Sequence, residues 1–272
     1  MTAKVLYKIT VRNKIIGYKI EINGIGYRLV SKAELRGYIL DNAKLTKNGR
    51  LLGNIPSLER RIIKLYHGSP NRVINPTFGM GKDMHDYGRG FYLTPNLELA
   101  KEWATCSGSS EGYVHAYLLD LTDLNVMDFD KTDVLHWLAE LMKHRDAADS
   151  TRYKKLAPLF IEKYKINTDK FDVIKGWRAD SSYFYIGKAF ARDEVDVSIL
   201  DRLLKIGDLG VQYCIKSKKA YDNLYKHGTI KIDNMEEYTI KYNQRDTAAR
   251  NKMRELIESK ENTCRNTFSS LI

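Results

Sequence analysis

Cysteine is scarce in this sequence, and long apolar runs are missing from it. The 272 residues include three cysteines, Cys106, Cys214 and Cys264, an odd number without metal-like spacing. Such usage favours reduced thiols over a disulfide framework or a zinc site. No apolar run approaches the roughly 18 residues that a membrane span requires, and charges interrupt the first residues, so we expect no signal peptide. These features predict a cytoplasmic protein without a bound metal.

The sequence also lacks internal repeats, low-complexity tracts and the glycine-rich fingerprint of Rossmann dinucleotide-binding folds. The stretch Gly79–Lys82 is too short and too badly placed to be a phosphate loop. Any dinucleotide would therefore have to be held without the N-terminus of a Rossmann helix.

Positive charge is concentrated at one end of the chain. Residues 1–60 hold 12 Lys and Arg against 4 Asp and Glu, whereas residues 61–230 hold 25 against 23. Residues 231–272 hold 8 against 7, so most of the net charge of +11 lies in the first fifth of the chain. A compact basic module beside a near-neutral body favours a docking surface for something acidic, nucleic acid first. The alternative is that the excess charge only aids solubility.

Residues 1–55 predict a small, basic, mostly β domain that docks an acceptor or a partner. Apolar and polar residues alternate over Lys4–Arg12, and further strands are expected over Ile16–Ile22 and Tyr27–Val30. Ser31 and Glu34 have the spacing of a capping box at the start of a short helix. A glycine and a proline in residues 53–57 indicate a linker to the next domain.

Residues 60–230 form a second predicted domain in which strands and helices are mixed. Strands are expected over Arg61–His67, Gly88–Thr94, Tyr113–Leu121, Asn125–Phe129, Phe171–Gly176 and Val211–Ile215. Helices are expected after Pro95 and over Val134–His144, Leu156–Tyr164 and Ser181–Phe190. The mixing favours an α+β fold over a doubly wound sheet. Residues 231–272 predict a charged helical extension.

Three strand residues beside glycines are candidate site residues: His67, Tyr92 and Gln212. Taken singly, each has an ordinary structural explanation, such as a hydrogen-bonded histidine at a strand end or a tyrosine in the core. Their order along the chain and the motifs around them make the three together stronger candidates for a site than each is alone. The relevant segments are Leu65–Ser69, Asp86–Thr94, Ala100–Ala104, Asp172–Asp180 and Gln212–Ser217.

These segments resemble the motifs of ADP-ribosyltransferases, in the His-Tyr-x branch that includes diphtheria toxin and the poly-ADP-ribose polymerases. The chain is most similar to a bacterial family known as domain of unknown function 3990. The resemblance covers about residues 60–230. It implies an α+β core built on a split, mixed or antiparallel β-sheet, with NAD as co-substrate held by that sheet.

The resemblance also assigns roles to single residues. His67 would hydrogen-bond ribose hydroxyls of NAD, and Gly68 would offer backbone groups to the nicotinamide amide. Tyr92 would stack on the nicotinamide ring, and Trp103 would complete a sandwich around it or be an ordinary core residue of its helix. Catalysis is assigned to His67, Tyr92 and Gln212. The residues implied to bind NAD are His67, Gly68, Ser69, Arg89, Tyr92, Trp103 and Gln212, with Arg89 reaching a phosphate.

Gln212 departs from the strongest form of the pattern. Many active relatives carry a glutamate there, whose carboxylate binds the ribose 2′-hydroxyl and stabilises the cationic transition state. Gln212 would bind the same hydroxyl with a dipole in place of a charge, so single transfer is expected and chain building is not. Arginine-modifying relatives carry an acidic or amide residue where Gly210 stands, which makes arginine a poor candidate acceptor. Asp180 also fits the pattern, either near the ribose or as a helix cap.

We therefore expect a mono-ADP-ribosyltransferase whose acceptor is nucleic acid (RNA included) or, next, a protein. Members of the resembled family look like toxins of toxin–antitoxin or phage-defence systems, which implies an antitoxin partner. Two alternatives stay open. One is an NAD glycohydrolase with water as acceptor, and the other is a non-catalytic protein that binds nucleic acid or a partner on a degenerate transferase fold.

Overall fold

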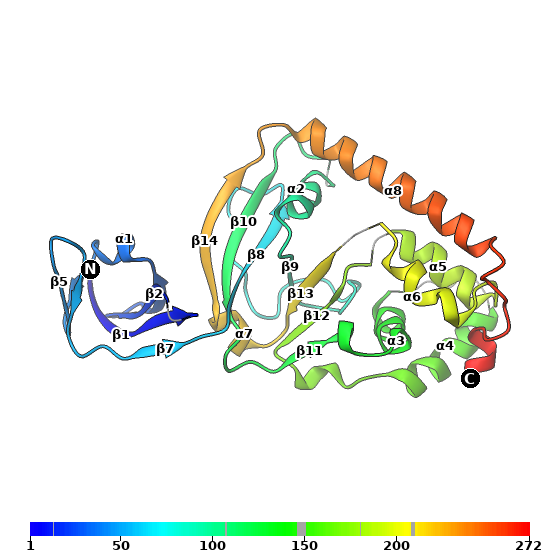
Figure 1. The fold of residues 1–272 in the computed structure, drawn as a ribbon, viewed down its shortest axis with the longest axis horizontal. Coiled ribbons are helices and arrows are strands. Elements are labelled where there is room, and N and C mark those ends of the chain that lie inside the picture. The colour runs from blue at the N-terminus through cyan, green and yellow to red at the C-terminus, as the bar shows by residue number, and fades with distance from the viewer. Residues whose placement is uncertain (13, 107, 146–150, 180, 208–209) are drawn as a thin grey trace. The chain divides into compact units, whose positions relative to one another are not determined.

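The computed structural model describes residues 1–12, 14–106, 108–145, 151–179, 181–207 and 210–272. The chain divides into two compact units (Figure 1). The first comprises Met1–Ile63 together with Leu118–Asp123 and Asn223–Tyr225, and the second comprises the remaining segments. Among the described residues, no helix combines the length and the apolar character needed to cross a membrane.

The first unit is a small β structure. Its main sheet has the order β3-β2-β1-β4, with β7 paired in parallel to β1, and a separate hairpin joins β5 to β6. Its elements are β1 (Thr2–Val11), β2 (Lys14–Ile22), β3 (Gly26–Val30), α1 (Lys32–Leu35), β4 (Ile39–Leu40), β5 (Lys44–Leu45), β6 (Leu51–Leu52) and β7 (Ser57–Glu59). Alternation along β1 and β2 buries Val5, Ile20 and Ile22 in one cluster. The predicted capping box is present, because the Ser31 hydroxyl accepts from Glu34 N and the Glu34 carboxylate accepts from Ser31 N.

The second unit combines strands, helices and short 3₁₀ turns. Its strands are β8 (Ile62–Ser69), β9 (Phe91–Leu93), β10 (Tyr113–Asp120), β11 (Val126–Asp128), β12 (Val173–Trp177), β13 (Val211–Ile215) and β14 (Leu224–Lys231), three of which extend past the boundary of the unit. Its helices are α2 (Leu97–Thr105), α3 (Val134–His144), α4 (Thr151–Tyr164), α5 (Ser181–Ala191), α6 (Val197–Lys205), α7 (Lys218–Asp222) and α8 (Met235–Ile257). The 3₁₀ turns are η1 (Phe129–Lys131), η2 (Thr168–Lys170) and η3 (Phe268–Leu271).

These strands form two sheets. One has the order β14-β10-β8, and the other has the order β11-β12-β13-β9. The second sheet is mixed, because β11 and β12 are parallel while β13 pairs antiparallel with both β12 and β9. An isolated bridge between Tyr66 and Thr94 joins β8 to the end of β9, so the two sheets meet there.

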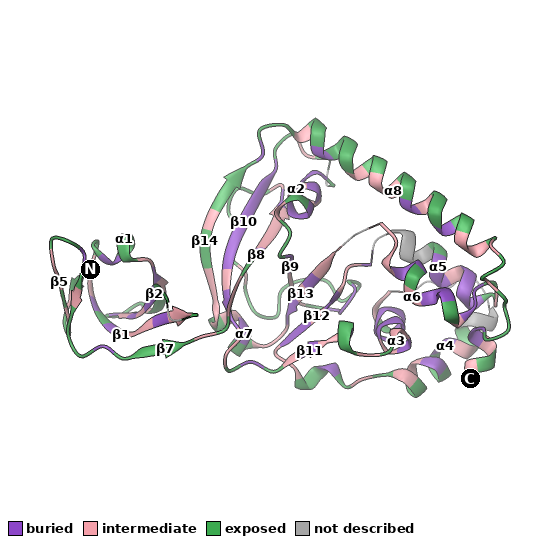
Figure 2. Cartoon of the chain, in the orientation of Figure 1, coloured by how far each residue is buried: buried purple, intermediate pink, exposed green. Residues whose placement is uncertain are grey.

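Helices enclose the main core beside the second sheet. Leu138 and Leu141 of α3, Phe160 of α4 and Leu203 of α6 are fully buried in one apolar cluster. Figure 2 shows α3 and the central strand β10 largely buried, whereas the edge strand β14 is mostly exposed. The long helix α8 is exposed over much of its surface and buries Met253 against the core.

The α+β class predicted from the sequence is confirmed. The predicted bounds of α3 and β13 agree with the structure, and most other expected elements are present with ends shifted by a few residues. The helix expected after Pro95 is α2, and Asn96 caps it, because its side chain accepts from the amides of Glu98 and Leu99. Neither α6 nor β14 was predicted from the sequence.

Asp196 fixes the start of α6 to the C-terminal segment. Its side chain is buried and accepts hydrogen bonds from Ser198 N (3.0 Å), Thr263 Oγ1 (2.6 Å), Arg265 N (2.9 Å) and Asn266 N (3.2 Å). Burial raises the pKa of Asp196, but the hydrogen bonds from Thr263 and Ser198 outweigh it and hold that pKa well below its usual range. One carboxylate therefore caps a helix and anchors a loop.

We expect Asp196→Ala to lower the free energy of unfolding by about 3 kcal/mol at pH 7, because a helix cap and several bonds to a charged group are lost together. Urea unfolding measures the difference. The matched control is Asp201→Ala on the same helix, where the carboxylate is half exposed and pairs with Lys205. Equal losses for the two variants would contradict the structural role given to Asp196.

Candidate functional site

A cavity of about 460 Å³ in the second unit brings together four of the residues selected from the sequence. His67 comes from β8, Tyr92 from β9, Trp103 from α2 and Gln212 from β13. The full lining is His67, Gly81, His85, Asp86, Gly90, Phe91, Tyr92, Trp103, Arg145, Arg178, Ala179 and Gln212. Its volume lies within the range of small-molecule sites, roughly 300–1,000 Å³.

Strand register explains why these residues converge. Cys214 lies opposite Tyr92 in the β13–β9 pair, and Gln212 precedes Cys214 by two residues. Because side chains alternate along a strand, Gln212 and Tyr92 project from the same face of the sheet. The bridge between Tyr66 and Thr94 then places His67 beside Tyr92, although the two residues belong to different sheets.

His67 is held as a neutral imidazole. Its Nδ1 lies 2.8 Å from the carbonyl oxygen of Tyr92, and its ring packs on Phe91 with centroids 4.6 Å apart. A carbonyl oxygen can only accept, so Nδ1 carries the proton and Nε2 has the free lone pair. Burial lowers the pKa of His67 to about 4. At neutral pH this side chain is therefore a hydrogen-bond acceptor at Nε2.

Tyr92 presents its ring to the cavity, because its hydroxyl is already occupied. The hydroxyl donates to the carbonyl of Gly88 (2.6 Å) and accepts from the amide of Tyr87 (2.9 Å). Burial raises the pKa of Tyr92, so the phenol stays protonated. The ring of His85 lies 5.3 Å away, centroid to centroid. A flat aromatic surface is what Tyr92 can offer a ligand.

Trp103 also faces this cavity. It is partly buried, and the guanidinium carbon of Arg178 lies 4.9 Å from the centroid of its ring. The indole Nε1 is buried and has no hydrogen-bond partner among the described residues. Because this N–H is covered by the protein, the aromatic ring is what Trp103 contributes to the cavity wall.

Gln212 belongs to a buried polar network that the sequence did not reveal. Its Nε2 donates to Asp86 Oδ2 at 2.6 Å and to the carbonyl of Trp177 at 3.3 Å. Asp86 also accepts from Arg145 Nη1 at 2.6 Å and from the amide of Ala179 at 2.9 Å. Burial raises the pKa of Asp86, and the positive charge of Arg145 opposes that shift.

Several cavity residues were thus missed in the sequence. Asp86 is the first residue of the Asp86–Thr94 motif, and this position could have identified it as a site residue. Arg145 lies at the end of α3, outside the matching motifs, and Arg178 lies just after β12, inside the Asp172–Asp180 motif, but neither was selected as a site residue. Only the tertiary fold shows that both cations line the cavity with Asp86.

Three residues assigned to NAD lie outside the cavity lining. Arg89 is exposed and pairs with Asp83 through two contacts, Nε–Oδ1 at 3.0 Å and Nη2–Oδ2 at 2.7 Å. Ser69 is buried, and its hydroxyl accepts from the amide of Asn71. Gly68 packs against α2, where an added Cβ would overlap the carbonyl oxygen of Ala100.

The Asp172–Asp180 motif begins and ends with an aspartate. Asp172 ties the entry of β12 to its neighbours, because its carboxylate accepts from the amide of Asn125 and from the hydroxyl of Ser217. Asp180 lies outside the described residues.

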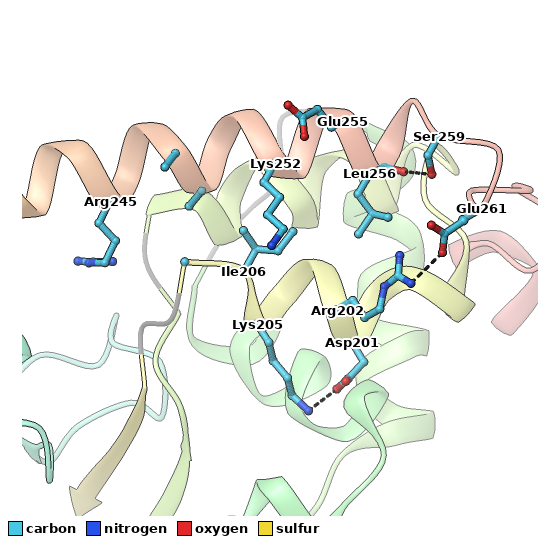
Figure 3. A pocket seen from close by; sticks show the side chains of 13 residues that line it. Asp201, Arg202, Lys205, Ile206, Arg245, Lys252, Glu255, Leu256, Ser259 and Glu261 are labelled. Carbon is cyan, nitrogen blue, oxygen red and sulfur yellow. Dashed lines mark hydrogen bonds and ion pairs between the residues drawn. The ribbon is translucent and has the colours of Figure 1, made fainter.

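A larger groove of about 910 Å³ lies between α6 and α8 (Figure 3). Within it, Lys205 pairs with Asp201, and Arg202 pairs with Glu261. Arg245 of α8 pairs with Glu102 of α2. None of the residues selected from the sequence lines this groove, so the cavity at His67 is the candidate functional site.

The low pKa of His67 predicts a pH-dependent stability. The unfolded chain protonates this residue below about pH 6.5, whereas the folded protein does not until about pH 4. Stability should therefore fall between pH 6.5 and 4, by up to about 3 kcal/mol from this group, and be unaffected by it above pH 6.5. Denaturant unfolding of the wild type and His67→Gln across this range measures the effect.

The difference between the two proteins should shrink as the pH falls, since the variant has no such group to protonate. His227→Gln is the control, because His227 is exposed. Parallel curves for the wild type and His67→Gln would contradict the neutral, buried state of His67.

Comparison with known proteins places the chain in a family. The model of the family described as protein of unknown function (DUF3990) matches residues 63–225, more than half of the chain. No curated protein and no solved structure matches the chain. The matched segment contains His67, Tyr92 and Gln212 and all twelve residues that line the cavity. The chain belongs to the DUF3990 family.

Proposed function

We propose that this protein cleaves NAD and transfers a single ADP-ribose unit to a macromolecular acceptor. The observation that carries the proposal is the convergence of His67, Tyr92, Trp103 and Gln212 on one cavity, from three strands and a helix. These four residues are among the seven that the resemblance to ADP-ribosyltransferases assigns to NAD.

The chemistry of the cavity suits the reaction. Cleavage of the nicotinamide–ribose bond passes through an oxocarbenium-like state, and nicotinamide leaves with a positive charge already present in NAD. The site therefore needs acceptors for ribose hydroxyls and a fixed geometry more than it needs a strong acid. His67 Nε2 is a neutral acceptor. The ring of Tyr92 can stack on nicotinamide, with Trp103 in the wall of the same cavity.

Positive charge in the cavity supports binding of the pyrophosphate. Arg145 and Arg178 both line the cavity, and Arg145 is partly neutralised by Asp86. Arginine guanidinium groups are well suited to phosphate oxygens because their donors form a planar fork. We assign the phosphate contact to this pair in place of Arg89.

We propose nucleic acid as the preferred acceptor, with a protein next. The support is the excess of 12 basic over 4 acidic residues in the first 60. The first unit has a cavity of about 510 Å³ whose lining holds three cations, an aromatic ring and no acidic side chain: Arg36, Tyr38, Leu40, Ala43, Lys44, Leu45, Thr46 and Lys47. Cations next to an aromatic surface suit a phosphate backbone and an unstacked base.

The first test uses NAD labelled in the adenylate moiety, purified protein and a cell extract separated into protein and nucleic acid. We expect label in one fraction, and a loss of at least about fivefold in His67→Ala and Tyr92→Ala, because each removes a contact worth about 1 kcal/mol or more. The matched controls are the exposed His227→Ala and Tyr185→Ala.

Each other outcome has a defined meaning. Released nicotinamide with free ADP-ribose and no labelled macromolecule would point to an NAD glycohydrolase. Neither label nor nicotinamide would contradict the enzymatic proposal and favour a non-catalytic binding protein.

The second test separates docking from chemistry. Replacing Arg36, Lys44 and Lys47 with glutamine should reduce modification of a nucleic-acid acceptor and flatten its salt dependence, while NAD cleavage stays unchanged. The control removes the same charge from the other end of the chain, with Lys252→Gln, Arg254→Gln and Lys260→Gln. A parallel fall in NAD cleavage and acceptor modification would show that the first unit does not act as a docking surface.

A further inference from the structure

The side-chain amide of Gln212 has one chemically permitted orientation. Its nitrogen lies 2.6 Å from Asp86 Oδ2 and 3.3 Å from the carbonyl oxygen of Trp177. Both partners are acceptors in this arrangement, so the NH₂ group must face them and Oε1 must point away. Gln212 is 3 % exposed, which leaves little room for water to replace these partners.

The contacts of Asp86 are those of a carboxylate. Oδ1 accepts from the guanidinium of Arg145 at 2.6 Å, and Oδ2 accepts from the amide of Ala179 at 2.9 Å as well as from Gln212. Burial raises the pKa of Asp86, and the ion pair with Arg145 and the two N–H donors favour the charged form against that rise. One donor lies at the end of α3, one lies in the segment after β12, and one lies on β13. The carboxylate is therefore held from several sides.

A charge-assisted hydrogen bond polarises the group that donates it. Negative charge on Asp86 draws the amide protons of Gln212 toward it and leaves more electron density on Oε1. In a buried site this polarisation is screened less than it would be in water. An amide held in this way is a fixed acceptor with part of the character of a carboxylate.

We propose that Asp86 is a positioning residue that enables Gln212 to replace a catalytic glutamate. Asp86 orients and polarises the Gln212 amide, so that Oε1 accepts the ribose 2′-hydroxyl and stabilises the positive charge that develops as nicotinamide leaves. This inference rests on the proposed NAD cleavage. It explains how a chain without a glutamate at the third position supplies negative charge there: the carboxylate comes from Asp86, 126 residues earlier in the chain.

The test is an exchange of the two groups. Asp86→Asn, Gln212→Glu and the double variant are compared by kcat and KM for nicotinamide release. We expect Asp86→Asn to lower kcat by about 100-fold with KM changed less than threefold, since transition-state stabilisation is lost and binding is largely kept. Gln212→Glu places a second carboxylate beside Asp86, and buried like charges cannot both ionise, so its kcat also falls.

The double variant distinguishes a positioning role of Asp86 from a merely structural one. It again pairs an amide with a carboxylate, now with the charge on residue 212 itself, so its kcat should exceed that of either single variant by at least about tenfold. A merely structural Asp86 predicts losses that accumulate in the double variant, and that result would overturn the proposal. Wild-type kcat in Asp86→Asn would overturn it as well.

Controls distinguish a loss of catalysis from a loss of folded protein. Asp83→Asn removes an exposed carboxylate three residues away and should leave kcat within twofold of the wild type. Melting curves by circular dichroism report the folded fraction of each variant at the assay temperature. If Asp86→Asn does not fold, the comparison of Gln212→Glu with the double variant still decides. If the wild type releases no nicotinamide, the proposed function fails and this inference fails with it. If the wild type is active and the losses in kcat accumulate in the double variant, the inference alone is rejected.

Discussion

A carboxylate buried away from water must be surrounded by donors, and that requirement at Asp86 organises the candidate site. An unpaired charge in a protein interior costs several kcal/mol, so the fold has to bring partners to it. Arg145, Ala179 and Gln212 meet that need from three separate segments. The same contacts place two of the cavity walls, because Gln212 lies on the second sheet and Arg145 follows α3. A single buried anion therefore links the helical core to the strands that carry Gln212 and Tyr92.

The loop that carries Asp86 is fixed just as firmly on its other side. Tyr87 is completely buried, and its hydroxyl donates to the carbonyl of Trp177 and accepts from the indole of Trp137. Gly90 passes so close to β13 that an added Cβ would collide with the thiol of Cys214. The loop thus begins with the buried Asp86, continues with the buried ring of Tyr87 and ends at Gly90, where there is no room for a side chain. This rigidity holds Tyr92 at a constant place in the cavity wall.

Local patterns in the sequence predicted much of the fold and part of the site. Alternation in β1 and the helical spacing of α3 depend on neighbours a few residues away, so both were recognised. The missed helix α6 has a clear signal in hindsight, with Asp196 as cap and apolar residues at positions 199, 200, 203 and 204. The missed strand β14 is an exposed edge with few apolar residues, and its sequence carries little signal. The partnership of Asp86 with Gln212 and Arg145 depends on contacts over 126 and 59 residues, which no local pattern encodes. For the same reason the sequence favoured Arg89 over Arg145, which lies outside the motifs, and over Arg178, whose motif does not show that it lines the cavity.

The protonation states around the cavity have a consequence for ligand binding. His67 and His85 have lowered pKa values, that of Tyr92 is raised, and Asp86 is bound to Arg145. At neutral pH the two imidazoles and the phenol in the cavity wall are thus uncharged. A ligand that enters the cavity therefore meets neutral rings beside one buried ion pair.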